Sequence, residues 1–239
     1  MLFCTVLFPQ RAFPQTADSL ARTSSGSLQF QLLGGLGVNY IGDWGPASHF
    51  RVGIDATWSH ADNSGDGNDY SIYSSTPGST SSSWSTTQPE QSSTSYKISV
   101  SGVYAQEIAG YANAVLYCGA GPMVSYSYDR NSSATPQTRI EVSGTYFTTY
   151  ASSSTSKTWG IGPLAILGVK SRILDHLSLS AEVSISALYQ WTSETRFTRV
   201  MYVYPPPSSG SVNDFGGNSN LKGWAVSLSG IRIGVIVNL

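Results

Sequence analysis

The sequence predicts an all-β fold, namely a closed up-and-down antiparallel β-barrel of eight strands that cross a membrane. First, alternation of apolar and polar residues with period two recurs along the chain, whereas apolar residues at helical spacing are hard to find. Second, charged residues make up only 11% of the 239 residues, against about 25% in soluble proteins. Lipid-facing surfaces exclude charge, because a Lys or Arg at mid-bilayer costs about 2–4 kcal/mol. Third, the segments between strands alternate between short and long.

The N-terminal residues 1–15, MLFCTVLFPQRAFPQ, predict the remnant of a secretory signal peptide, followed by an N-terminal segment over 16–27. An ordinary N-terminal strand is the alternative. Further along, apolar stretches such as Leu164 to Leu167 are much shorter than the ~18 residues that a spanning helix needs. Membrane crossing must therefore rely on strands.

Seven strands follow from the alternation. In the strand over 49–59, Phe50 and Ile54 share an apolar face and Arg51 and Asp55 the polar one. The strand over 176–191 far exceeds the globular average of about 5–6 residues and suits a tilted membrane strand, which needs about 9–11. The seven ranges are 28–40, 49–59, 95–104, 113–128, 157–170, 176–191 and 222–239.

Barrels formed by one bacterial chain have an even number of strands, so one strand is missing from this count. Residues 28–48, SLQFQLLGGLGVNYIGDWGPAS, are the place for it. We expect two short strands there that turn at Gly34–Gly35, which brings the total to eight.

The connections fall into two classes. Short ones cover about 41–48, 105–112 and 171–175. Long ones, rich in Ser, Thr, Gly and Pro, cover about 60–94, 129–156 and 192–221. Outer-membrane barrels have short periplasmic turns and long extracellular loops, so we expect the barrel over 28–239 with three long extracellular loops. Within the second loop, 139–150 alternates and predicts a hairpin above the membrane.

Aromatic residues gather at the strand ends next to the long loops, as expected for a girdle at the outer membrane interface. These residues are Trp58, Tyr126, Tyr128, Trp159, Tyr189, Trp191 and Trp224.

Five charged residues lie on polar strand faces that would point into the lumen, namely Arg51, Asp55, Lys97, Glu182 and Arg232. Unpaired charges are costly there, and opposite charges close over one another. The interior of an eight-stranded barrel is only just wide enough for side chains. We therefore expect a salt-bridged structural plug rather than a constriction that selects ions.

The C-terminal strand places Ile231, Ile233, Val235, Val237 and Leu239 on one face. Upstream, Trp224 and Leu228 have the opposite phase, which predicts a bulge near Ser229–Gly230. The pattern resembles the terminal strand of outer-membrane barrel proteins, which the barrel-assembly machinery reads. That family usually ends in an aromatic residue, and Leu239 departs from it.

The segments 116–130, 159–170 and 175–184 also resemble strands of small outer-membrane barrel proteins of the OmpA/OmpX kind. The resemblance covers about 28–239. It implies a bacterial outer-membrane location, contact with outer-membrane lipid and the assembly machinery as a partner during biogenesis.

Several function classes are disfavoured. A net charge of −1 provides no basic field for nucleic acid, and Cys4 and Cys118 do not suggest a metal cluster. Residues 62–69 resemble the first half of a calcium loop, but Tyr73 occupies the place of its bidentate Glu. We expect no metal or other cofactor.

His60 beside Asp62 raises a hydrolase hypothesis, but a base also needs a nucleophile in reach. His49, His60 and His176 lie in different segments and share no obvious site. The sequence therefore predicts no catalytic site. It predicts a barrel with a structural or surface-interaction role, such as envelope integrity or adhesion. The alternatives are a narrow pore for ions or small solutes and a secreted glycan-binding β-sandwich.

Overall fold

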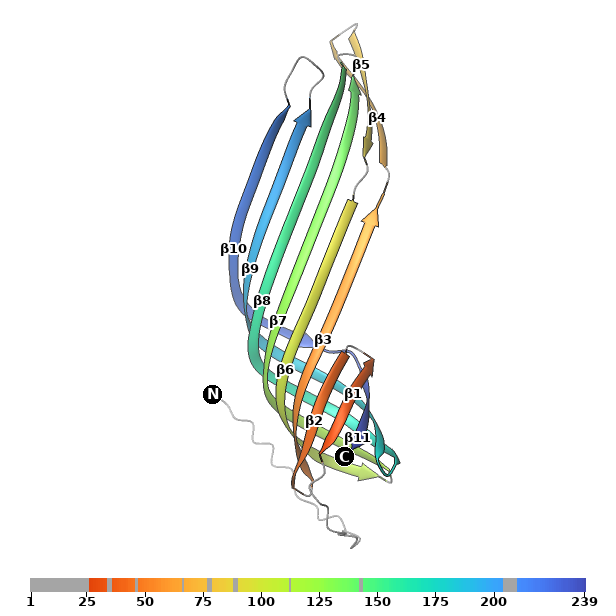
Figure 1. Ribbon diagram of the computed structural model, residues 1–239, viewed down its shortest axis with the longest axis vertical. Coiled ribbons are helices and arrows are strands. Elements are labelled where there is room, and N and C mark those ends of the chain that lie inside the picture. Colours follow the sequence, from red (N-terminus) through yellow and green to blue (C-terminus); the bar gives the residue numbers. More distant parts are fainter. Residues whose placement is uncertain are drawn as a thin grey trace.

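The computed structural model describes residues 26–239 except 34–35, 46, 66, 77–78, 88–89, 112, 142–143 and 204–209. It forms one antiparallel sheet of 11 strands (Figure 1). They are β1 (Ser27–Leu33), β2 (Leu36–Gly45), β3 (Ser48–Ser64), β4 (Gly67–Thr76), β5 (Ser79–Thr87), β6 (Glu90–Tyr111), β7 (Ala114–Glu141), β8 (Gly144–Leu174), β9 (Leu177–Val203), β10 (Ser211–Leu228) and β11 (Arg232–Asn238). In the described part of the chain, no helix has the length and apolar character to span a membrane.

The sheet closes on itself at its lower end. There β11 pairs with β1, from Asn238 opposite Ser27 to Ile233 opposite Leu33. The ring then runs β1-β2-β3-β6-β7-β8-β9-β11, which is eight strands in antiparallel order. The predicted closed eight-stranded barrel is confirmed, and the described residues form one sheet rather than two stacked ones. We call this ring the barrel.

The eighth strand, which the alternation alone did not locate, lies within residues 28–48 as expected. Residues 28–48 hold all of β2 and all of β1 except Ser27, and these strands pair from Ser27 opposite Ile41 to Gln31 opposite Gly37. The expected turn at Gly34–Gly35 lies outside the described residues. The prediction of two short strands is confirmed.

The predicted bulge near Ser229–Gly230 is also confirmed. Leu228 lies opposite Ile185 of β9, whereas Arg232 lies opposite Glu182. Four steps along one strand therefore match three along the other, and this extra residue exchanges the two faces. Leu228 above the bulge and Ile233 below it consequently share the outer face.

The prediction that 129–156 and 192–221 are long loops was wrong. β7 and β8 stay paired from Ala114 opposite Ser171 to Glu141 opposite Gly144, and β9 pairs with β10 up to Tyr202 opposite Ser211. The segment 60–94 likewise contains the end of β3, the strands β4 and β5, and the start of β6. The expected hairpin over 139–150 is the top of β7 and β8.

The physical reason for the error is that Ser, Thr and Asn occupy both faces over most of these strands. An apolar alternation is then absent, and the composition resembles that of a loop. Cross-strand hydroxyl pairs stabilise such a sheet, as between Ser133 and Ser152, with 2.7 Å between the hydroxyl oxygens, and between Thr158 and Thr192, at 2.9 Å.

Above the barrel the sheet is open. The pairing of β2 with β3 ends at Leu36 opposite Ala56, and in the described part of the chain β10 pairs only with β9. Figure 1 shows β3 and β6 to β10 rising far above the short β1 and β2, with the β4–β5 hairpin at the top. We call residues 59–64, 90–95, 129–141, 144–156, 194–203 and 211–219 of these six long strands the upper sheet.

Candidate functional sites of the barrel and the upper sheet

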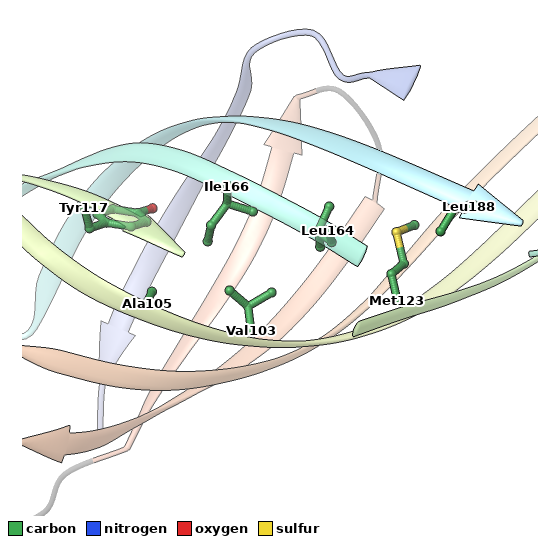
Figure 2. Packing of buried hydrophobic residues seen from close by; sticks show 7 residues of the cluster. All are labelled: Val103, Ala105, Tyr117, Met123, Leu164, Ile166 and Leu188. Carbon is green, nitrogen blue, oxygen red and sulfur yellow. The ribbon is translucent and has the colours of Figure 1, made fainter. Parts of the chain in front are cut away.

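Apolar side chains fill part of the lumen. Val103 and Ala105 of β6 meet Leu164 and Ile166 of β8, and all four are buried. Figure 2 shows these side chains between the strands, together with Tyr117, Met123 and Leu188, the other members of the cluster. The cluster closes the lumen by packing, as expected for a narrow barrel.

A buried ion pair lies in the lumen beside this cluster. Arg51 Nη1 donates to both carboxylate oxygens of Glu182, each at 2.7 Å, and both residues are almost fully buried. Gln29 Nε2 donates to Glu182 Oε1 at 2.8 Å, and the Tyr117 hydroxyl donates to the same oxygen. The carboxylate is thus held by charge-assisted hydrogen bonds from three strands, which compensates for the loss of water around it.

A second pair joins Arg232 Nη1 to Asp55 Oδ2 at 3.3 Å. The structure therefore brings together Arg51 with Glu182 and Asp55 with Arg232. It places Lys97 elsewhere, beside Thr57 and Ser127 in the register, nearer the upper sheet.

Two hydrogen-bond partners of Glu182, Tyr117 and Gln29, were not predicted from the sequence. Tyr117 lies in a predicted strand, but a tyrosine does not reveal which face it occupies. The ring fits because β8 has Gly168 beside it, where a Cβ would lie 2.6 Å from the Tyr117 ring. Gln29 alternates with Leu28 and Phe30 in the first predicted strand, and this alternation could have identified it as facing the lumen.

The seven aromatic residues of the expected girdle lie on the outer face of neighbouring strands. Ring centroids of Tyr126 and Trp159 are 4.6 Å apart, and those of Tyr189 and Trp224 are 5.5 Å apart. Trp191 joins the second group at 5.0 Å from Tyr189. Such distances are typical of favourable aromatic pairs.

Trp58 connects to this group through Tyr96, which is not among the seven residues of the expected girdle. Tyr96 lies opposite Trp58 in the register and stacks on Tyr128 at 5.0 Å. We call these eight residues the aromatic belt. It extends across the outer face of β3, β6, β7, β8, β9 and β10.

Below the belt the outer face of the barrel is apolar and exposed. Its side chains include Phe50, Val52, Ile54, Val100, Val124, Ile161, Leu167, Leu179, Ile185 and Ile233. The stretch from Phe50 to Trp58 matches the roughly 9–11 residues of a tilted membrane strand. Above the belt, polar residues such as Ser132, Ser153 and Asn218 take over these positions.

The C-terminal strand contributes to both faces. Ile233 and Val235 lie on the outer face, whereas Ile236, which is 1% exposed, and the Arg232 head group point into the lumen. Ile231 is exposed directly before β11, and Leu239 is exposed directly after it.

A hydrogen-bonded row lies just above the belt on the outer face of β3 and β6. His60 Nδ1 is 2.9 Å from Thr94 Oγ1, and His60 Nε2 is 3.0 Å from Asp62 Oδ2. The imidazole also stacks on Trp58, with an interplanar angle of 4° and 6.3 Å between centroids. Hydrogen bonds from Ser92 and His60 lower the pKa of the exposed Asp62 carboxyl, so that it is ionised at neutral pH.

The three histidines lie apart, as their positions in the sequence suggest. His49 contacts the Tyr117 ring edge-on at 5.7 Å between centroids, and His176 lies at the turn before β9. Among the described residues no group of three or more His, Cys, Asp or Glu could hold a metal ion. Of the calcium-like segment, 62–64 end β3 and 67–69 begin β4, while residue 66 lies outside the described part.

The upper sheet carries a depression of about 510 Å³ lined almost wholly by small hydroxyl and amide side chains. Asn63, Ser93, Asn131 and Ser154 are among these residues, and Arg196 provides a positive charge at one side. Arg196 is itself paired with Glu194 at 2.5 Å. This composition suits hydrogen bonding to a polar ligand.

No family model matches this chain, and no curated protein matches it. Among solved structures, the chain is similar to CarO of Acinetobacter baumannii, with 10% identity, a TM-score of 0.36 and coverage of 90% of this chain and 97% of that one. A major outer membrane protein of Thermus thermophilus has 13% identity, a TM-score of 0.31 and coverage of 91% and 100%.

Proposed function

We propose that the chain is an integral protein of the bacterial outer membrane, with a structural or surface-interaction role. The observation that carries this proposal is the aromatic belt above a closed apolar band. Exposure of so large an apolar area, which includes Val52, Val100 and Leu179, to water would be unfavourable. Contact of the same side chains with the hydrocarbon of a membrane is favourable.

The lumen argues against a pore. At the level of the apolar band it holds the Val103 to Leu188 cluster and the ion pair of Arg51 with Glu182. A conducting path would need both to move. A structural anchor therefore fits the barrel better than transport of ions or small solutes.

The upper sheet provides the surface for interaction. Its strands extend far beyond the length required for a membrane, and both faces carry Ser, Thr and Asn. The hydroxyl-lined depression suggests a polar partner such as a glycan or a polar protein surface. Envelope integrity and adhesion both agree with a tall structure rich in Ser, Thr and Asn above the membrane.

Membrane fractionation together with heat-modifiable migration in detergent gels tests this proposal. We expect the chain in the outer-membrane fraction, and we expect the unheated protein to migrate differently from the boiled one. Recovery of a folded monomer in the soluble fraction would overturn the proposal. In planar bilayers the purified barrel should be silent, and steady unitary conductance would favour the pore instead.

A further inference from the structure

With a neutral His60, the row of Asp62, His60 and Thr94 has one consistent proton arrangement. Because the ionised Asp62 can only accept, His60 Nε2 must carry the proton and donate it. In the neutral imidazole Nδ1 then has a free lone pair, so the Thr94 hydroxyl donates to it at 2.9 Å. A hydroxyl that donates to an imidazole, which in turn donates to a carboxylate, is the arrangement that activates a nucleophile.

The position of the row is also specific. All three side chains lie on the outer face. His60 and Thr94 are one step of the alternation above Trp58 and Tyr96 of the aromatic belt, and Asp62 is two steps above it. If the belt marks the membrane interface, as in the proposed function, Thr94 lies at the level of lipid head groups and the ester bonds beneath them. His60 and Asp62 have side-chain exposures of 41% and 67%, so a lipid can reach them from outside.

A cation completes the row. Arg130 of β7 lies directly opposite Thr94, on the side away from His60, and is exposed. Residues opposite each other on one face have Cβ atoms about 4.5–5.5 Å apart, within reach of an Arg side chain. Arg130 can thus approach the oxygen of a carbonyl group bound at Thr94, or a lipid phosphate beside it.

We propose that Thr94, His60, Asp62 and Arg130 form a hydrolytic site for acyl esters of anionic outer-leaflet lipids. Thr94 is the nucleophile and His60 the general base. Asp62 is a positioning residue that holds the tautomer of His60, and Arg130 stabilises the negative charge on the carbonyl oxygen. This activity goes beyond the anchoring role and uses a surface that the anchoring role leaves unexplained.

The reaction balances with water as the only co-reactant. Thr94 Oγ forms a bond to the ester carbonyl carbon while its proton passes to His60 Nδ1. The bond from that carbon to the leaving alcohol oxygen breaks, and the alcohol takes the proton from His60. Water, deprotonated by His60, then attacks the acyl-Thr94 ester. A free fatty acid leaves and Thr94 regains its proton.

The test uses the full chain purified in detergent micelles and then in phosphatidylglycerol vesicles. Release of fatty acid is followed by mass spectrometry, and p-nitrophenyl decanoate provides a continuous assay. We expect T94V and H60Q to lower the rate by about 100-fold or more, since a nucleophile or its base is lost. T94S should retain activity, and D62N should lower kcat with little change in KM.

A matched control is T158V, which removes a Thr hydroxyl that pairs with Thr192 elsewhere in the sheet. It should leave the rate unchanged. Heat-modifiable migration reports the fold of every variant. A long-chain fluorophosphonate should label Thr94 in the parent and not in H60Q. The proposal is overturned if the folded parent releases no fatty acid above the rate of the solvent, or if folded T94V is as fast as the parent.

Discussion

The barrel and the upper sheet share the five strands β3, β6, β7, β8 and β9 but are stabilised by different means. In the barrel the ion pair of Arg51 and Glu182 is sealed, with side-chain exposures of 6% and 4%. In the upper sheet Arg199 and Asp214 make a comparable bidentate pair, at 2.8 and 3.0 Å, with exposures of 49% and 44%. In both pairs the guanidinium group binds both carboxylate oxygens at 2.7–3.0 Å, but the first pair is buried and the second is exposed to water.

This comparison shows that environment rather than geometry sets the energetic weight of these contacts. Water screens the exposed pair and solvates either partner when the other is removed. The buried pair has no such substitute, so each charge depends on the other. The outer surface is also divided: it is apolar below the aromatic belt, and above it Ser, Thr and Asn predominate, with Phe147, Phe197 and Met201 as exposed exceptions.

The largest expected effect comes from removing one partner of the buried pair. R51A should lower the free energy of unfolding by about 3–5 kcal/mol, because Glu182 is left charged and buried. The double replacement R51M/E182L should recover most of this loss. Urea titration in micelles measures the change, with R199A as the exposed counterpart. A loss in R199A as large as that in R51A would contradict the difference between the two regions.

The second largest effect is expected from a charge on the outer face, whose cost in stability should differ between the barrel and the upper sheet. V100R places a cation in the apolar band and should cost about 2–4 kcal/mol if that band faces hydrocarbon. S153R places the same side chain on the outer face above the belt and should change stability by less than about 0.5 kcal/mol. Unfolding in lipid vesicles compares them, and equal costs would argue against a membrane boundary at the belt.

The boundary itself offers a smaller test. Tyr126 and Trp159 have ring centroids 4.6 Å apart, and a double-mutant cycle with Y126L and W159L should yield a coupling of about 0.5–1.5 kcal/mol. A coupling near zero would mean that the rings bind lipid independently rather than each other.

The smallest effect concerns pH. Hydrogen bonds from Arg199 lower the pKa of Asp214 below its usual range. The stabilisation is therefore fully present above the pKa of Asp214 in the unfolded chain, and it is lost as pH falls through the lower pKa of the folded state. Amide hydrogen exchange between β9 and β10 should quicken there, relative to the intrinsic rate. The same shift in D214N would contradict this assignment.

The barrel was predictable because the outer face of its strands is apolar, whereas many of the side chains that face the lumen are polar. Alternation such as Phe50, Val52 and Ile54 against Arg51 and Asp55 marks a strand and both of its faces. The even strand count placed β1 and β2, and the change of phase between Leu228 and Ile233 placed the bulge. Each of these inferences depends on contrast along one strand.

The upper sheet was missed because that contrast is absent. Ser132 and Ser133 point to opposite faces and are both serine, so the sequence shows no alternation there that would indicate a strand. The row of Asp62, His60 and Thr94 was predicted only in part, because the sequence suggested a hydrolase from His60 with Asp62 but did not indicate Thr94. Thr94 joins them only through the register of β3 with β6, across a long sequence separation that a single sequence does not specify.

Labelling of intact cells with a membrane-impermeant maleimide tests the central claim most directly. The background is C118A, which removes the free cysteine Cys118 from the described part of the chain. We expect S153C to react on intact cells and V100C to remain unlabelled there while reacting after solubilisation and unfolding. Labelling of V100C on intact cells, or labelling of S153C only after the outer membrane is broken, would contradict an apolar band within the membrane and a polar sheet outside it.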